Sequence, residues 1–210
     1  MPPKPRITKE MIISAGFELV KNYGIEKLNV RNIASALNCS TQPIMYHYRS
    51  VDELKNDIYA AADKYHSEFI MNISDKENIM ISIGLNYIRF AVGEQHLFRF
   101  LFQSDKFTNT GFTELLSGEL LSGLIEPLCF EAQLSKEEGK EVFMSLFVTV
   151  HGLASLYANN SMKYEEEVCT ELLVSAMFGT IGYITTKRTA SASSKQSFED
   201  KGEIHNEKIT

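Results

Sequence analysis

Tryptophan is absent from this chain of 210 residues, which holds only three cysteines and five prolines. Cys39, Cys129 and Cys169 lie far apart, form no CxxC pair and have no histidine at metal-ligand spacing. These features disfavour a disulfide framework and a structural zinc site. With 12 glycines, 44% apolar and 23% charged residues, the composition is that of an ordinary folded chain, which excludes collagen-like, low-complexity and largely disordered proteins.

Long uninterrupted apolar runs are also lacking. The basic residues 1–6 are followed by an amphipathic segment, which is not the apolar core of a secretory signal. The most apolar window, residues 142–158, is interrupted by polar residues that include Ser145, Thr149 and His151. Its length and polarity predict that it does not span a bilayer. We therefore expect a soluble cytoplasmic protein without a membrane partner.

Strict alternation of apolar and polar residues, the pattern of a half-buried strand, is not found between turn signals. The predicted fold class is therefore all-α. Beyond residue 75, helical stretches are expected at residues 78–93, 96–103, 113–129, 136–157 and 164–187. The following segment has few large apolar side chains, so residues 188–210 are expected to form a disordered tail.

The first 71 residues carry the signals of four helices. Thr8 suits the cap of the first helix, and Gly24 suits the left-handed residue that ends it. Asn29 suits the cap of a short second helix, and Asn38 suits a tight turn because asparagine tolerates positive φ. Residues 50–53 form a capping box that begins a fourth helix extending to about residue 71. Two short helices around a tight turn predict a helix-turn-helix unit.

The third helix, capped by Ser40 or Thr41, is rich in side chains that bind nucleic acid. A purely structural short helix would expose Glu, Lys and Ala instead. Hydroxyl and amide groups bind phosphates or base edges, and Gln42 has the geometry to pair with adenine. An ordinary polar surface helix is the alternative. The candidate DNA-contacting residues are Arg31, Ser40, Thr41, Gln42, Pro43, Met45, Tyr46, His47 and Arg49.

Charge is divided unevenly along the chain. The formal net charge of −6 argues by itself against a general polyanion binder. However, residues 1–50 hold seven basic and three acidic side chains, a net charge of +4, and the other 160 residues carry −10. The basic part can meet phosphates, whereas the acidic part is repelled by DNA.

Residues 8–60 resemble the DNA-binding domain of the TetR (tetracycline-repressor) family of bacterial regulators. Residues 8–24 resemble its first helix, Val30–Ala34 its second, and Met45–Ser50 the aromatic-His-aromatic end of its recognition helix. The resemblance implies a DNA-binding domain at residues 8–60 behind a basic arm at residues 1–7. That arm is either a plain tail or a reader of the minor groove.

Four positions depart from the family pattern. Asn38 replaces a usual glycine, Cys39 a small β-branched residue and Met45 a frequent tyrosine. Val51 stands where a lysine often touches a phosphate, so that contact does not transfer to this chain.

The rest of the chain resembles the family's regulatory domain more loosely, at residues 87–91, 97–102 and 150–156. This resemblance implies a helical ligand-binding and dimerisation domain at residues 72–187. Aromatic side chains there fit a plain core or the lining of a cavity, and His151 fits a buried, satisfied histidine or a ligand contact. The candidate ligand-binding residues are Tyr87, Phe98, Phe102, Met144, Phe147 and His151.

Together these features predict a homodimeric repressor that binds an inverted-repeat DNA operator and is released by a small apolar effector. A dimer is expected because one short recognition helix buries too little surface for specific binding. The alternative is a helical enzyme or small-molecule carrier with a vestigial helix-turn-helix; an activator is also open. No catalytic set, metal-ligand cluster or phosphate-binding glycine loop is found, so we assign no catalytic residue, metal or cofactor.

Overall fold

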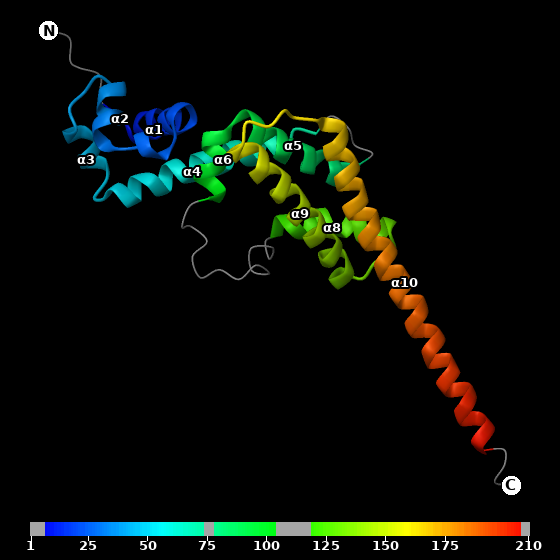
Figure 1. Ribbon diagram of the computed structural model, residues 1–210. Helices are drawn as coiled ribbons and strands as arrows, with labels where there is room; N and C mark the ends of the chain where they lie inside the picture. The colour runs from blue at the N-terminus through cyan, green and yellow to red at the C-terminus, as the bar shows by residue number, and fades with distance from the viewer. Residues whose placement is uncertain (1–6, 74–77, 104–118, 207–210) are drawn as a thin grey trace. The chain divides into compact units, whose positions relative to one another are not determined.

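The computed structural model describes residues 7–73, 78–103 and 119–206, with side chains described for residues 7–73, 78–103 and 123–191. Every regular element in these ranges is helical (Figure 1), which confirms the predicted all-α fold class. The elements are α1 (Lys9–Tyr23), the 3-10 helix η1 (Ile25–Lys27), α2 (Val30–Ala36), α3 (Gln42–His47), α4 (Val51–Ile70), α5 (Ile79–Gly93), α6 (Gln95–Phe102), α8 (Glu119–Glu131), α9 (Lys136–Asn159) and α10 (Glu166–Asn206).

Caps and positive-φ residues set the bounds of the first two helices. The side chains of Thr8 and Asn29 accept hydrogen bonds from first-turn amides of α1 and α2, at 3.3 and 2.9 Å. Gly24 ends α1 with a φ of +86°, and Asn38 has a φ of +49° in the turn after α2. These residues therefore act as the sequence predicts, because they satisfy helix-end groups and adopt the left-handed turn.

The junction of α3 and α4 differs slightly from the expectation. Thr41 is the N-cap residue of α3, but its side chain accepts no capping hydrogen bond, and Pro43 lies in the first turn. The capping box of α4 is present: the Glu53 amide donates to Ser50 Oγ at 3.1 Å. The Glu53 carboxylate accepts from the Arg49 amide at 3.0 Å, which ties the end of α3 to the start of α4.

The chain divides into two compact units, residues 1–111 with 150–166 and residues 112–149 with 167–210. In the first unit, α1 packs against α2, α3, α4 and α6, and α4 packs against α5 and α6. The predicted domain boundary near residue 71 lies inside the first unit. Helix α4 packs against α1, which precedes this boundary, and against α5 and α6, which follow it. The core of the helix-turn-helix part consists of Ile12, Val20, Ile33, Ala34, Ile44, Tyr48, Leu54, Ile58 and Ala62.

A helix predicted to end at Lys187 continues as α10 to Asn206. Residues 188–206, which were expected to belong to a disordered tail, are thus helical, and residues 207–210 lie outside the described residues. No proline or glycine interrupts residues 183–201, so the polar sequence remains compatible with a helix. Of the predicted helix at residues 113–129, the part before Glu119 also lies outside the described residues, and α8 ends at Glu131.

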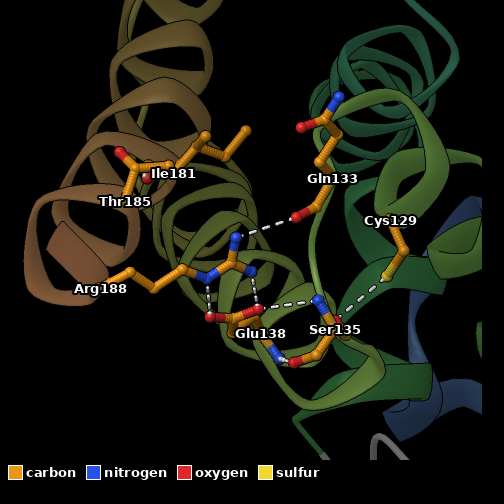
Figure 2. A network of polar contacts seen from close by, with 7 residues as sticks. All are labelled: Cys129, Gln133, Ser135, Glu138, Ile181, Thr185 and Arg188. Atoms are coloured by element: carbon orange, nitrogen blue, oxygen red, sulfur yellow. Dashed lines mark hydrogen bonds and ion pairs between the residues drawn. The ribbon is translucent and has the colours of Figure 1, made fainter. Parts of the chain in front are cut away.

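In the second unit, a polar network joins α10 to the turn between α8 and α9 (Figure 2). The Ser135 amide donates to the Glu138 carboxylate at 2.7 Å, and the Glu138 amide donates to Ser135 Oγ at 3.2 Å. The Arg188 guanidinium donates to both carboxylate oxygens of Glu138, and to the Gln133 carbonyl at 3.0 Å. Arg188 thus has fixed partners in a segment that composition alone assigned to a tail.

Helices α9 and α10 each expose large apolar side chains. On α9, Val148 and Leu156 lie on one face with Gly152 between them at four-residue spacing.

By length and composition, Lys136–Asn159 and Glu166–Ser191 are apolar enough to cross a membrane. The window at residues 142–158 is thus part of a longer helix, which corrects the prediction that it is too short. The indication of a membrane span is weak, because core helices of soluble proteins meet the same criterion.

We expect Gly16→Ala to lower the free energy of unfolding by about 1–3 kcal/mol, the usual cost of overpacking a core. A Cβ at Gly16 would lie 2.3 Å from Ile58 Cδ1 and 2.9 Å from Ile58 Cγ1. Urea unfolding followed by circular dichroism measures the loss. Gly93→Ala is the matched control, because nothing lies within 4 Å of a Cβ there. Equal stability of the two variants would contradict the close packing of α1 on α4.

We also expect the contribution of Arg188 to stability to depend on pH. Hydrogen bonds from the Arg188 side chain lower the pKa of Glu138 to about 2, with further help from Ser135. Because this pKa lies below the ordinary value of 4.5, the stabilisation is complete above pH 4.5 and is lost as the pH falls toward 2.

The stability difference between the wild type and Arg188→Met should therefore shrink between pH 5 and about pH 2, as measured by denaturant unfolding. Lys187→Met removes a charge from the neighbouring position and is the control for net charge. A difference that stays constant over this range would rule out the Glu138–Arg188 coupling.

Candidate nucleic-acid interface and effector site

Helix α3 is anchored by two inward side chains and presents the others to solvent. Ile44 and Tyr48 are 0% and 1% exposed, whereas Tyr46 is 81% exposed. Gln42 is exposed at the start of the helix, where recognition helices make base contacts. Of the residues predicted to contact DNA, Arg31, Ser40, Thr41, Gln42, Met45, Tyr46 and Arg49 are exposed, and Pro43 and His47 are half-buried.

Two guanidinium groups accompany this face. Arg31 lies on α2 and Arg49 directly follows the end of α3, and both are exposed. Within the described residues neither side chain forms an ion pair. Their charges are therefore not neutralised by a carboxylate partner and can bind phosphates.

The end of α3 is held from α1 and α4. Lys9 Nζ lies 2.7 Å from Asp57 Oδ2 and 5.2 Å from the centre of the Tyr48 ring. The hydrogen bond from Lys9 lowers the pKa of Asp57, so this carboxylate stays ionised beside its partner. Burial raises the pKa of Tyr48, which keeps its phenol neutral. The ion pair and the buried ring together fix the direction of the exposed face of α3.

His47 has a partner that the sequence did not indicate. Its Nε2 lies 3.0 Å from the Ile7 carbonyl, to which it donates a hydrogen bond. This bond ties the last residue of the predicted arm to α3, whereas residues 1–6 lie outside the described residues. One ring nitrogen of His47 is therefore occupied, and only the other is left for the predicted DNA contact.

Four of the six predicted ligand-binding residues come together in the first unit. Tyr87 on α5 and His151 on α9 are joined by a hydrogen bond of 2.9 Å between the phenol and Nδ1. The rings of Phe98 and Phe102 on α6 have centres 5.8 and 6.0 Å from the His151 ring. Burial raises the pKa of Tyr87 and lowers the pKa of His151, so both side chains are neutral near pH 7.

The other two candidates, Met144 and Phe147, lie on the part of α9 that belongs to the second unit. Both are half-buried, and the Phe147 ring stacks on Phe143 with centres 6.3 Å apart. Met144 and Phe147 are therefore not part of the cluster that the first unit forms around His151.

His66 on α4, which was not among the predicted ligand-binding residues, is buried against the same cluster. Its ring centre lies 5.2 Å from Tyr87 and 5.0 Å from Phe102. The signal was present, because residue 66 continues the four-residue spacing of Leu54, Ile58 and Ala62 along the buried face of α4. Because histidine is usually counted as a polar residue, its place on the buried face of α4 was not recognised from the sequence.

A second polar cluster joins α1, α4 and the junction of α5 with α6. Lys21 Nζ lies 2.9 Å from the Glu94 carboxylate and donates to the Tyr65 hydroxyl at 3.1 Å. The Tyr65 hydroxyl in turn donates to Glu94 at 2.9 Å. These three side chains connect the helix-turn-helix part of the first unit with the helices that hold Tyr87 and Phe98.

No family model and no curated protein matches the sequence. Several solved structures match the fold, including the following two. A TetR-like transcriptional regulator from Rhodococcus sp. RHA1 has a TM-score of 0.55 at 16% identity, over 85% of this chain and 96% of its own. The multidrug binding protein EbrR, complexed with imidazole, has a TM-score of 0.52 at 15% identity, over 80% and 88%. The chain therefore has the fold of TetR-like regulators, in agreement with the resemblance noted in its sequence.

Proposed function

We propose that this protein is a DNA-binding transcriptional regulator, specifically a cytoplasmic homodimeric repressor of the TetR type. The observation that carries the proposal is the orientation of α3: Ile44 and Tyr48 are buried, while Gln42 and Tyr46 face solvent. A short helix held in this way presents polar and aromatic groups to the edges of bases in a major groove.

The proposed contacts with DNA are of two kinds, contacts with base edges and contacts with phosphates. Gln42, at the start of α3, makes the base contact, because its amide matches the two hydrogen-bonding groups of adenine. Tyr46, the hydroxyls of Ser40 and Thr41, and the guanidinium groups of Arg31 and Arg49 bind phosphates and set the register of α3 on the duplex. The net charge of +4 on residues 1–50 favours docking by this end of the chain.

A homodimer supplies the second recognition helix. Exposed apolar side chains on α9 and α10, including Val148, Leu156, Leu172 and Phe178, need a cover in water, and a second copy of the chain provides one. Two-fold symmetry then places two α3 helices on half-sites about 34–36 Å apart, or a multiple of this, which requires an inverted-repeat operator.

The effector is a small, largely apolar molecule bound at the cluster of Tyr87, Phe98, Phe102 and His151. Rings surround this cluster, and a few polar groups give it orientation, as is typical of ligand sites between helices. The structural likeness to EbrR, described as a multidrug binding protein, supports such a role. The effector releases the operator only if it binds the DNA-free conformation more tightly than the DNA-bound one.

Substitutions on the exposed face of α3 should weaken operator binding without unfolding the protein. Selection from random DNA duplexes yields the preferred inverted repeat, and dissociation constants are then measured at fixed salt. We expect Tyr46→Ala to raise the dissociation constant about tenfold or more, and Gln42→Ala to relax the preference for one base pair.

Tyr23→Ala is the matched control, because Tyr23 is also exposed but lies at the end of α1. Arg49→Ala should weaken specific and non-specific binding alike and reduce the salt dependence by about one phosphate contact. Wild-type operator affinity in both Tyr46→Ala and Gln42→Ala would refute the assignment and favour a carrier or enzyme with a vestigial helix-turn-helix.

The dimer is tested by sedimentation at micromolar concentration. We expect the wild type to sediment as a dimer and Phe178→Glu to sediment as a monomer, because the substitution places a charge in the interface on α10. Phe130→Glu on α8 changes another exposed phenylalanine and should leave the dimer intact. A monomeric wild type would contradict the dimer.

A further inference from the structure

His66 is buried with one ring nitrogen unused. Only 6% of the side chain is exposed, and among the described residues Nε2 has no hydrogen-bond partner. The ring centre lies 5.2 Å from Tyr87, 4.8 Å from Phe90 and 5.0 Å from Phe102, all in edge-to-face geometry. We call these four residues the His66 cage. A buried polar atom without a partner is costly, so its presence needs a reason.

The cage is electrically neutral. Burial alone lowers the pKa of His66 to about 4, and burial alone lowers the pKa of the neighbouring His151. No charged side chain adds to either shift. Both imidazoles are uncharged near pH 7, and an ion entering the cage would lose its hydration without meeting an opposite charge.

The surrounding rings favour a flat aromatic guest. Phe90 is fully buried, whereas Phe102 is half-buried at the last residue of α6. A ring that enters beside Phe102 meets aromatic edges and faces in the offset and edge-to-face arrangements that such pairs prefer. A hydroxyl on that ring can donate to Nε2 or accept from it, so it satisfies His66 in either tautomer.

We propose that the His66 cage binds an uncharged aromatic molecule carrying a hydroxyl group, with His66 Nε2 as its hydrogen-bond partner. This inference rests on the proposed effector site and specifies its ligand. Apolar aromatics without a hydroxyl bind more weakly, since they leave Nε2 unpartnered. Aromatic anions and cations of the same size are rejected.

The test uses four probes of one size and the full-length protein without DNA. Phenol carries the hydroxyl, toluene replaces it with a methyl group, and benzoate and benzylammonium carry charges of opposite sign. We expect calorimetric titration to give phenol a dissociation constant about fivefold below that of toluene, the value of one hydrogen bond. Benzoate and benzylammonium should not bind measurably.

His66→Phe should abolish the preference for phenol over toluene, since it removes the nitrogen and keeps the cage apolar. His96→Phe is the matched control, because His96 lies outside the cage on α6 and the same substitution there should preserve the preference. If His66→Phe does not fold, nitrogen NMR of the wild type replaces it: phenol must shift the Nε2 resonance of His66 and toluene must not.

The proposal is overturned if toluene binds as tightly as phenol, if either ion binds as well as phenol, or if His66→Phe keeps the preference. A fixed His66 Nε2 resonance on addition of phenol also overturns it. Because all of these measurements omit DNA, they are independent of operator binding. Failure here with intact operator binding removes the ligand assignment alone and leaves the regulator in place.

Discussion

The burial of one face of α4 is the constraint on which the first unit depends. Leu54, Ile58, Ala62 and His66 follow one another at four-residue spacing, and none is more than 6% exposed. Helix α1 packs against α4 on the helix-turn-helix side, and α5 and α6 pack against it beyond. Each buried aliphatic side chain contributes about 1.5–3 kcal/mol, so a shift of α4 disturbs both regions together. The helix-turn-helix part and the aromatic cluster therefore share one core.

Within this core, α3 is too short to be stable by itself, and its neighbours decide what it presents. Ile44 and Tyr48 fill the interior, and the Lys9–Asp57 pair lies against the Tyr48 ring. The outward direction of Tyr46 and Gln42 follows from those contacts rather than from their own interactions. The polar cluster of Lys21, Tyr65 and Glu94 joins α1 and α4 to the α5–α6 junction through an ion pair and hydrogen bonds.

Helix caps and turns were predicted correctly from the sequence, because each depends on one residue type that satisfies one steric or hydrogen-bonding requirement. Asn29, Asn38 and Ser50 act as expected because caps and positive-φ turns depend only on near neighbours. Tertiary contacts were not predictable in this way. His66 was missed because its burial depends on α5 and α6, and the extent of α10 was missed because the partners of Arg188 are 50 and 55 residues away. Tyr87 and His151 were found from a resemblance, but their hydrogen bond comes from the fold.

The neutrality of the cage around His66 has a consequence for how a cell would deliver its guest. Molecules without charge cross lipid bilayers unaided, whereas aromatic acids and amines in their ionised forms meet a large barrier in hydrocarbon. A regulator of the proposed kind that accepts only the uncharged form responds to the concentration that equilibrates across the membrane, without a dedicated importer. For a weakly acidic guest, the fraction detected also falls as the surrounding pH rises, although His66 itself does not titrate near pH 7.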